Sequence, residues 1–338
     1  MKDKANVSYQ TKRVKLGDIL PLDTPFSITL DVSEVCNLRC SYCFRCSEEN
    51  RTNSYAWKNN LMEEGTFYRA VSQIKEFPDK VKKISLSGHG EPLCNRKIIE
   101  MIKYLKVELP ETVIEIHTNA TLLDEAYALA LAESGIDKVN ISLQGLSAEK
   151  YKEVCGGNIN FEKFLAAIEI LYKNRKNTIV NVKIVDAALD EENNEKRFHE
   201  LFDKISDHAI IEKVVPIWKI AEYRNSKETT NKFGEEIPYQ RCCSLLFYSL
   251  YVAPDGTIYA CSQPEVSFNL GTIFDTTLLA AWNGEKRKNF LLSHLELGRA
   301  TIEDCKDCYI AQNSIMTEED TLNDSYEDIL KRMRDDIR

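Results

Sequence analysis

The sequence contains no long hydrophobic run: its longest apolar stretch, Leu245–Ala253, is far shorter than the roughly 20 residues that span a bilayer. The first segment, Met1–Asp18, is polar and lacks the apolar core of a signal peptide. Basic residues are in the minority, with 44 Lys and Arg against 53 Asp and Glu. Nucleic-acid binders carry a basic surface, so the acidic balance predicts no nucleic-acid partner. The missing apolar segments predict a cytoplasmic protein with no membrane partner.

Cysteine is too scarce for a disulfide scaffold. The chain has 11 cysteines in 338 residues, well under the roughly 8–10% that marks small disulfide-rich proteins. Disulfides are also rare in a reducing cytoplasm. All but Cys94 and Cys155 gather in two groups, within residues 36–46 and 242–308. Cysteines bunched in this way indicate metal or redox chemistry.

The middle of the chain alternates between strand and helix patterns. Strands are predicted at 26–32, 83–86, 113–117, 138–143, 180–185 and 210–215, and helices at 63–75, 96–105, 124–133, 161–172 and 192–205. Such alternation predicts βαβ units with a parallel sheet, and right-handed crossovers curl about six units into part of a barrel. We therefore expect an α/β fold, a partial (β/α)6 TIM-type barrel with a small C-terminal domain of a β-hairpin plus helix.

The alternation stops near residue 220, which sets the expected domain boundaries. The stretch 222–239 is polar and contains Gly234 and Pro238, as a linker does. A helical pattern follows at 278–297, and the last residues, 320–338, are predicted to form a charged, mostly solvated helix. The expected division is 1–25 lead-in, 26–225 barrel, 226–240 linker, 241–315 cysteine-rich domain and 316–338 C-terminal helix.

The first cysteine group has the spacing CxxxCxxC, with Cys36, Cys40 and Cys43 directly after the first predicted strand. Three thiolates at this spacing suit three corners of a [4Fe–4S] cube. The fourth iron then has no protein ligand and is free to bind a small molecule, as an open metal position does. A structural zinc site is the alternative, with Cys46 as the fourth ligand.

This motif, in this place, resembles the radical S-adenosylmethionine (SAM) superfamily, and the resemblance covers residues 26–218. Tyr42 occupies the family's aromatic position before the third cysteine. The sequence Gly88-His-Gly-Glu-Pro92, after the second strand, resembles the family's Gly-Gly-Glu-Pro motif with a histidine substituted. The resemblance implies that Cys36, Cys40 and Cys43 hold a [4Fe–4S] cluster to which SAM binds.

The resemblance also implies a set of SAM contacts at the carboxyl ends of the strands, where parallel barrels place their sites. These implied contacts are Tyr42, Gly88, Gly90, Glu91, Pro92, Thr118, Asn119, Ser142 and Gln144. The family often carries aspartate at the position of Gln144, so a structural and a functional role remain equally open for this residue.

The second cysteine group combines a turn with a CxxC pair. Cys243 and Cys261 flank the turn at Gly256, and a hairpin turned there brings the two thiols side by side. Cys305 and Cys308 complete four ligands, for which a zinc ribbon is one interpretation. The pattern resembles the first half of the SPASM extension of radical SAM enzymes, in its shorter "twitch" form, which implies one auxiliary [4Fe–4S] cluster. Cys242 competes with Cys243, whose distance to the turn is the better match.

The two resemblances together imply radical chemistry on a small substrate. A 5′-deoxyadenosyl radical released from SAM would abstract hydrogen, and an auxiliary cluster that accepts an electron favours net oxidation. The ligand pattern is similar to that of 2-deoxy-scyllo-inosamine dehydrogenase-type enzymes, so we expect a sugar, polyol or aminocyclitol substrate and a flavodoxin- or ferredoxin-type electron donor. Epimerisation remains open, with Cys155 as a hydrogen donor. A peptide or protein maturase and, more remotely, a non-catalytic zinc-binding protein are the alternatives.

Overall fold

A single nine-stranded sheet organises the part of the chain that the computed structural model describes, residues 13–46, 59–189, 192–215, 230–262 and 268–335. Its strand order is β6-β5-β4-β3-β2-β1-β7-β8-β9. The strands are β1 Ser27–Leu30, β2 Lys83–Ser85, β3 Val113–Thr118, β4 Lys138–Leu143, β5 Ile179–Val185, β6 His208–Glu212, β7 Ser249–Val252, β8 Thr257–Tyr259 and β9 Asn269–Thr272. Strands β6 through β7 pair in parallel, and β7, β8 and β9 pair antiparallel.

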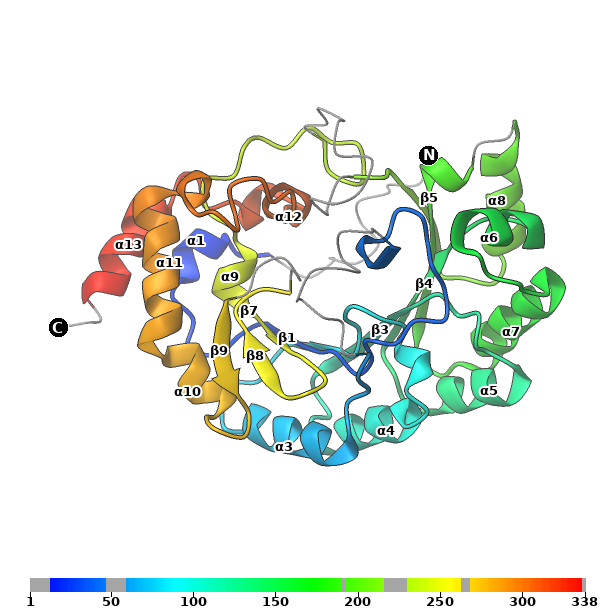
Figure 1. The fold of residues 1–338 in the computed structure, drawn as a ribbon, viewed down its shortest axis with the longest axis horizontal. Helices are drawn as coiled ribbons and strands as arrows, with labels where there is room; N and C mark the ends of the chain where they lie inside the picture. The colour runs from blue at the N-terminus through cyan, green and yellow to red at the C-terminus, as the bar shows by residue number, and fades with distance from the viewer. Residues whose placement is uncertain (1–12, 47–58, 190–191, 216–229, 263–267, 336–338) are drawn as a thin grey trace.

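The helices of the described residues are α1 Leu16–Ile19, α3 Glu64–Ile74, α4 Ile98–Glu108, α5 Glu125–Glu133, α6 Ala148–Cys155, α7 Phe161–Asn174, α8 Asn194–Phe202, α9 Leu245–Tyr248, α10 Leu278–Asn283, α11 Glu285–Leu297, α12 Ile310–Asn313 and α13 Tyr326–Asp335. Of these, α3, α4, α5, α7 and α8 lie along the outer side of the curved sheet (Figure 1). The six predicted strands and five predicted helices of the barrel are confirmed, and the expected partial (β/α)6 barrel is present.

The core lies between the helices and the outward faces of the strands. Ile28 and Leu30 of β1 are fully buried, whereas the alternate positions of that strand are only partly buried. Helix α7 buries the stripe of Phe164, Ile168 and Leu171 that the helical period predicts. The apolar side chains at alternate strand positions therefore pack against the apolar side chains that recur every 3.6 residues on the helices, and together they form one apolar layer.

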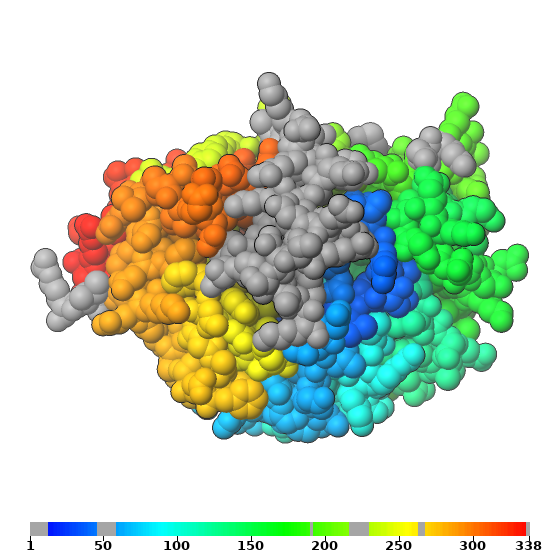
Figure 2. Space-filling model, in the orientation of Figure 1, coloured from blue at the N-terminus to red at the C-terminus, as the bar shows by residue number. Residues whose placement is uncertain are grey.

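The C-terminal hairpin is confirmed, but it is not separate from the barrel. Gly256 makes the turn at φ +84°, a conformation that favours glycine, and its N–H donates to the Ala253 carbonyl at 2.9 Å. Strand β7 then pairs in parallel with β1, with Ser27 opposite Ser249, so the hairpin extends the barrel sheet and shares its core. The space-filling view shows the C-terminal segments on one side and the barrel helices on the other (Figure 2). The expected boundary at 225/226 lies outside the described residues.

Two expectations at the C-terminus need correction. The helix predicted at 278–297 is two helices, α10 and α11, because the backbone of Gly284 is extended at φ −69°, ψ 149°. The final helix, α13, begins at Tyr326 rather than near residue 320; its buried residues are Ile329 and Met333, so most of it is solvated as expected. Arg332 donates to the carbonyls of Gly17 and Asp18 in α1. Within the described residues, no helix is long and apolar enough to cross a membrane.

Candidate active site

The first cysteine loop follows β1 and rests on the C-terminus of helix α6. The backbone N–H groups of Arg39 and Ser41 donate to the carbonyls of Cys155 and Val154, at 3.0 and 2.9 Å. A further bond closes the loop, from the N–H of Cys43 to the carbonyl of Cys40 at 2.9 Å. These bonds satisfy carbonyls that the end of a helix leaves unpaired, and they hold the loop on a rigid element.

The thiols of this loop lie close enough together to influence one another. Contact with Cys155, burial, and the neighbouring Cys43 and Cys36 all raise the pKa of Cys40. Burial raises the pKa of Tyr42, and Cys40 adds to that effect. Mutually repelling thiolates in a partly buried loop are stabilised by cationic iron, so the donor set fits a cluster held by three cysteines.

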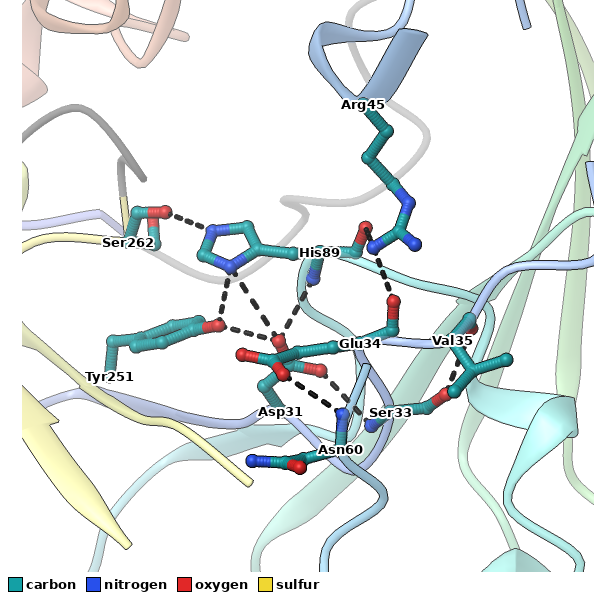
Figure 3. Close-up of polar contacts among 9 residues, drawn as sticks. All are labelled: Asp31, Ser33, Glu34, Val35, Arg45, Asn60, His89, Tyr251 and Ser262. Carbon is teal, nitrogen blue, oxygen red and sulfur yellow. Dashed lines mark hydrogen bonds and ion pairs between the residues drawn. The ribbon is translucent and has the colours of Figure 1, made fainter. Parts of the chain in front are cut away.

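The glycines of the Gly-His-Gly-Glu-Pro motif allow two chain segments to touch. A Cβ at Gly88 would lie 2.0 Å from Cγ of Asp31, and a Cβ at Gly90 would lie 2.3 and 2.5 Å from the carbonyl oxygens of Ser33 and Val35. Only glycine permits this approach. The motif is therefore pressed against the segment that leads from β1 into the cysteine loop, and Figure 3 shows this approach where His89 meets Asp31.

Glu91 joins three parts of the site. Its Oε1 accepts hydrogen bonds from the Leu93 N–H at 3.0 Å and the Thr118 hydroxyl at 2.5 Å, and its Oε2 accepts from the Asn119 N–H at 2.7 Å. The Asn119 amide donates in turn to Oδ1 of Asn37, inside the cysteine loop, at 3.0 Å. Burial raises the pKa of Glu91 to about 7, and these hydrogen bonds oppose the shift.

The structure brings the predicted SAM contacts to one edge of the barrel. Pro92 is buried and begins the 3-10 turn Pro92–Cys94, directly after Glu91. Gln144 follows β4, where its amide nitrogen donates to the Ser142 carbonyl at 3.1 Å. Its Oε1 is buried and has no hydrogen-bond partner in the described part of the chain. An unpaired buried acceptor at this edge fits a ligand that donates a hydrogen bond, such as a ribose hydroxyl.

Cys155 lies behind the cysteine loop. Its side chain is 2% exposed, and its thiol donates to the Tyr151 carbonyl one turn earlier in α6, at 2.8 Å. The same thiol contacts that of Cys40, which lowers the pKa of Cys155 to about 7. These contacts favour a role in anchoring the loop over access to a substrate.

The second thiol set gathers between the hairpin and the CxxC loop. Burial raises the pKa of Cys243 to about 12, and Cys308 and Cys305 add to the shift, so these three thiols lie within electrostatic reach. The Cys242 thiol points elsewhere and donates to the His294 carbonyl at 3.1 Å. This arrangement supports Cys243 as the ligand. Cys261 follows β8 and is partly buried.

Arg299, which sequence reasoning missed, holds the CxxC loop in place. Its buried guanidinium donates to the carbonyls of Cys305 and Cys308, at 2.9 and 2.8 Å, and to Gln312 Oε1 at 2.7 Å. Its Nε donates to the Gln240 carbonyl at 2.8 Å. A lone arginine next to a CxxC pair is a weak sequence signal, because exposed arginines are common near turns.

The thiols of the described residues are not gathered around the position of a single metal ion. A tetrahedral zinc ion with Zn–S near 2.3 Å draws its sulfur ligands to within about 4 Å of one another. In the portion of the chain described, no three His, Cys, Asp or Glu side chains converge closely enough to hold one metal ion. A cubane cluster places each thiolate on a separate iron and so needs a wider set. The side chain of Cys46 lies outside the described residues.

The inner face of the barrel sheet is polar, which sequence reasoning also missed. Polar residues at inward positions are Lys83 and Ser85 on β2, Glu115 and His117 on β3, Asn140 and Ser142 on β4, Asn181 and Lys183 on β5, and Glu212 on β6, and apolar residues such as Val185 and Ile210 share this face. Glu115 lies 2.9 Å from Nζ of Lys83 and 3.7 Å from Nε2 of His117. Although it sits inside the sheet, the His117 side chain is 44% exposed. The interior is thus accessible and lined with hydrogen-bonding groups.

Comparison with known families agrees with this geometry. The profile of the radical SAM superfamily matches residues 30–203, about half of the chain, and that of the SPASM iron–sulfur cluster-binding domain matches 242–309. The chain therefore belongs to the radical SAM superfamily. It is a radical SAM enzyme with a SPASM domain, and its cofactors are SAM and two [4Fe–4S] clusters.

Individual relatives differ in what they do. A probable GTP 3′,8-cyclase of Methanococcus maripaludis (strain S2) is 38% identical over 138 residues, 40% of this chain and 43% of that protein. The chain thus matches under half the length of this curated relative. Among solved structures, BtrN in complex with AdoMet and 2-DOIA aligns with a TM-score of 0.55 at 18% identity, covering 86% of this chain and 95% of BtrN. The anSMEcpe enzyme with bound AdoMet aligns with a TM-score of 0.56 at 18% identity, covering 92% and 100%. At these identities the structures show the shared fold.

Proposed function

We propose that this radical SAM enzyme is an oxidoreductase that removes hydrogen from a small sugar, polyol or aminocyclitol substrate. When bound, the cluster and SAM supply a 5′-deoxyadenosyl radical that abstracts hydrogen from an unactivated C–H bond. In this proposal Cys36, Cys40 and Cys43 hold that cluster. The SAM contacts are the nine residues implied by the family resemblance, with Glu91 binding through the one lone-pair site that its three hydrogen bonds leave open.

The composition of the second thiol set carries the proposal of oxidation. Cys308 and Cys305 raise the pKa of the Cys243 thiol, and Cys261 follows the hairpin strand β8. In this proposal the four cysteines are the ligands of one cluster. A cluster closed by four cysteines has no open iron for substrate and is suited to electron transfer. It would accept the electron that a substrate radical gives up as its carbon–oxygen bond becomes a carbonyl, while the hydroxyl proton is released to solvent. A flavodoxin- or ferredoxin-type protein would be the external electron donor for SAM cleavage.

The barrel interior supports a hydroxyl-rich substrate. His117, Lys183 and Asn181 present donors on the inner face, and Oδ1 of Asn181 is buried with no partner among the described residues. Unpaired polar groups reject an apolar ligand and favour one that supplies hydrogen bonds. Epimerisation is the weaker form of the proposal, because its candidate hydrogen donor, Cys155, is bonded behind the cysteine loop.

A second candidate function is cyclisation of a guanosine nucleotide. It is favoured by the sequence match to GTP 3′,8-cyclases, of which the probable enzyme of Methanococcus maripaludis is one.

A peptide substrate is a third candidate, because the fold aligns with that of Streptococcus suis SuiB bound to its precursor peptide SuiA at a TM-score of 0.54. We also propose the domain division 1–25, 26–225, 226–240, 241–315 and 316–338, with the 241–315 part joined to the barrel through β7.

Iron counting and a substrate screen test the proposal. After anaerobic reconstitution we expect about eight iron atoms per chain, falling to about four in a Cys36/Cys40/Cys43 triple-alanine variant. Reduced enzyme is then given SAM with C-deuterated sugars, aminocyclitols or GTP, and 5′-deoxyadenosine is examined for deuterium. Deuterium transfer together with a carbonyl product supports oxidation. A cyclised nucleotide would replace oxidation with the second candidate, and about four iron atoms in the wild type would refute the auxiliary cluster.

A further inference from the structure

His89, the histidine substituted into the SAM motif, contacts three elements that are far apart in the sequence. Its backbone N–H donates to Oδ2 of Asp31, after β1, at 3.0 Å, and its Nδ1 lies 2.8 Å from the hydroxyl of Tyr251 on β7. Its Nε2 lies 2.7 Å from the carbonyl oxygen of Ser262, after β8. Figure 3 shows the ring between Tyr251 and Ser262, with Asp31 beneath it.

The direction of the Ser262 bond follows from its chemistry. A carbonyl oxygen only accepts, so Nε2 of His89 carries the proton and donates it to Ser262. On the other side of the ring, Nδ1 faces the Tyr251 hydroxyl, which also lies 2.5 Å from Oδ2 of Asp31. Because the Tyr251 hydroxyl donates its one proton to Asp31, its 2.8 Å approach to Nδ1 is a close contact, and the Nε2 bond to Ser262 is what fixes the ring. The His89 side chain is only 12% exposed. Such a ring has little freedom to rotate.

The hydrogen bond from His89 to Ser262 lies beyond the end of β8, where strand pairing no longer holds the backbone. Strand β8 ends at Tyr259, and the next ladder-like bond runs from the Ala260 N–H to the Phe268 carbonyl, at 3.2 Å. Cys261 comes after this bond and directly before Ser262. The hydrogen bond from His89 thus fixes the backbone next to a proposed ligand of the auxiliary cluster.

The other end of the contact is equally fixed. Tyr251 belongs to β7, which pairs in parallel with β1 and places Tyr251 opposite Thr29. Asp31 is buried, and it accepts from the N–H groups of both Ser33 and His89. Because Gly88 has no Cβ, the motif approaches Asp31 closely enough for these bonds. His89 therefore belongs to the SAM motif and contacts the hairpin of β7 and β8, which Cys261 follows.

We propose that His89 is a positioning residue that sets the place of the Cys261 segment relative to the SAM-binding motif. This inference rests on the proposed function in taking Cys261 as a ligand of the auxiliary cluster and that cluster as the electron acceptor. Electron transfer between two sites depends on their separation, so a side chain that fixes this separation would govern how a substrate radical passes its electron on. The glycine of the family motif has no side chain with which to make this link.

The first test reads the auxiliary cluster alone, in the Cys36/Cys40/Cys43 triple-alanine background with about four iron atoms. We expect His89→Gly to release iron to a chelator about fivefold faster, the factor by which losing one ordinary hydrogen bond favours local opening. His89→Gln keeps an N–H donor and should restore much of the wild-type rate. Tyr251→Phe keeps the aromatic ring and should fall between them. The matched control is His199→Ala, whose ring bonds only locally, to Asp203 on the same helical face.

The second test measures the separation directly, by the dipolar coupling between the two reduced clusters in the full enzyme. We expect His89→Gly to broaden or shift the coupling and His199→Ala to leave it unchanged. An unchanged coupling with an unchanged rate of iron release overturns the inference, as does equal iron release in His89→Gly and His89→Gln. If the triple-alanine background binds no iron, the ligand assignment itself fails, which is a separate result. Should His89→Gly not fold, the comparison of Tyr251→Phe with His89→Gln decides the question by the same readouts.

Discussion

Replacing Gly90 by alanine should disrupt the SAM motif more than its small size suggests. The new Cβ would lie 2.3 Å from the Ser33 carbonyl oxygen and 2.5 Å from that of Val35. Both are backbone atoms, so the motif would have to move away from the segment after β1. Overpacking of this kind costs about 1–3 kcal/mol, and the movement would also break the bond from the Glu91 N–H to the Val35 carbonyl, 2.8 Å long.

Adding about 0.5–1.5 kcal/mol for that hydrogen bond gives a total loss of about 1.5–4.5 kcal/mol. Gly65 provides a matched control, because it lies in helix α3 and a Cβ there would meet nothing within 4 Å. Gly65→Ala should leave the protein unchanged or stabilise it by up to about 1 kcal/mol.

The assay is denaturant unfolding of anaerobically prepared protein, followed by circular dichroism, together with SAM cleavage by the reconstituted enzyme. We expect Gly90→Ala to lower both the unfolding free energy and SAM cleavage, and Gly65→Ala to lower neither. If Gly90→Ala is as stable as Gly65→Ala, the close approach of the motif to Ser33 and Val35 is wrong, and with it the argument that this approach shapes the SAM site.

Three further predictions concern side chains around the site. Arg299→Met should leave the carbonyls of the CxxC loop unpaired, which costs about 1–3 kcal/mol of stability for each carbonyl. The iron content should then fall toward about four atoms per chain. An unchanged iron count would contradict the role of Arg299. Cys155→Ser keeps a donor for the Tyr151 carbonyl, so iron content and turnover should persist; lost product with continued 5′-deoxyadenosine formation would instead identify a hydrogen donor. Glu91 has its pKa raised to about 7 in the folded protein, so the folded state binds a proton that the unfolded state does not, and stability falls as pH rises. Wild-type protein should lose about 1.4 kcal/mol between pH 6 and pH 8 relative to Glu91→Gln in urea unfolding, and parallel pH profiles would refute this.

Local patterns predicted the elements and the thiol groups well. Alternating apolar and polar residues predict the strand of Ile28 and Leu30, and the residue composition around Gly256 predicts the turn there. Both signals are contained in a few neighbouring residues. The break at Gly284 was missed because the apolar period continues through this residue. Only the extended backbone at that glycine separates the two helices. A periodic pattern does not reveal where a helix is interrupted without a strong breaker.

Contacts between distant segments could not be predicted. The pairing of Ser27 with Ser249 joins residues more than 200 positions apart, and no local pattern encodes such a register. The bonds from His89 to Tyr251 and Ser262 exist only because that pairing brings the hairpin over the SAM motif. In the sequence, His89 is a departure from a motif, and nothing around it indicates which carbonyl it will meet.

The polar barrel interior shows a different limit of sequence reasoning. Lys83, Glu115 and Lys183 alternate with buried apolar residues, and this pattern is typical of a strand with one face toward solvent. In a closed or partly closed barrel, however, the second face of each strand looks inward. The same alternation therefore describes both an exposed surface and a polar binding site, and only the curvature of the sheet separates them. Because curvature arises from how all the strands pair, the residues that would meet the substrate become recognisable only when the whole fold is known.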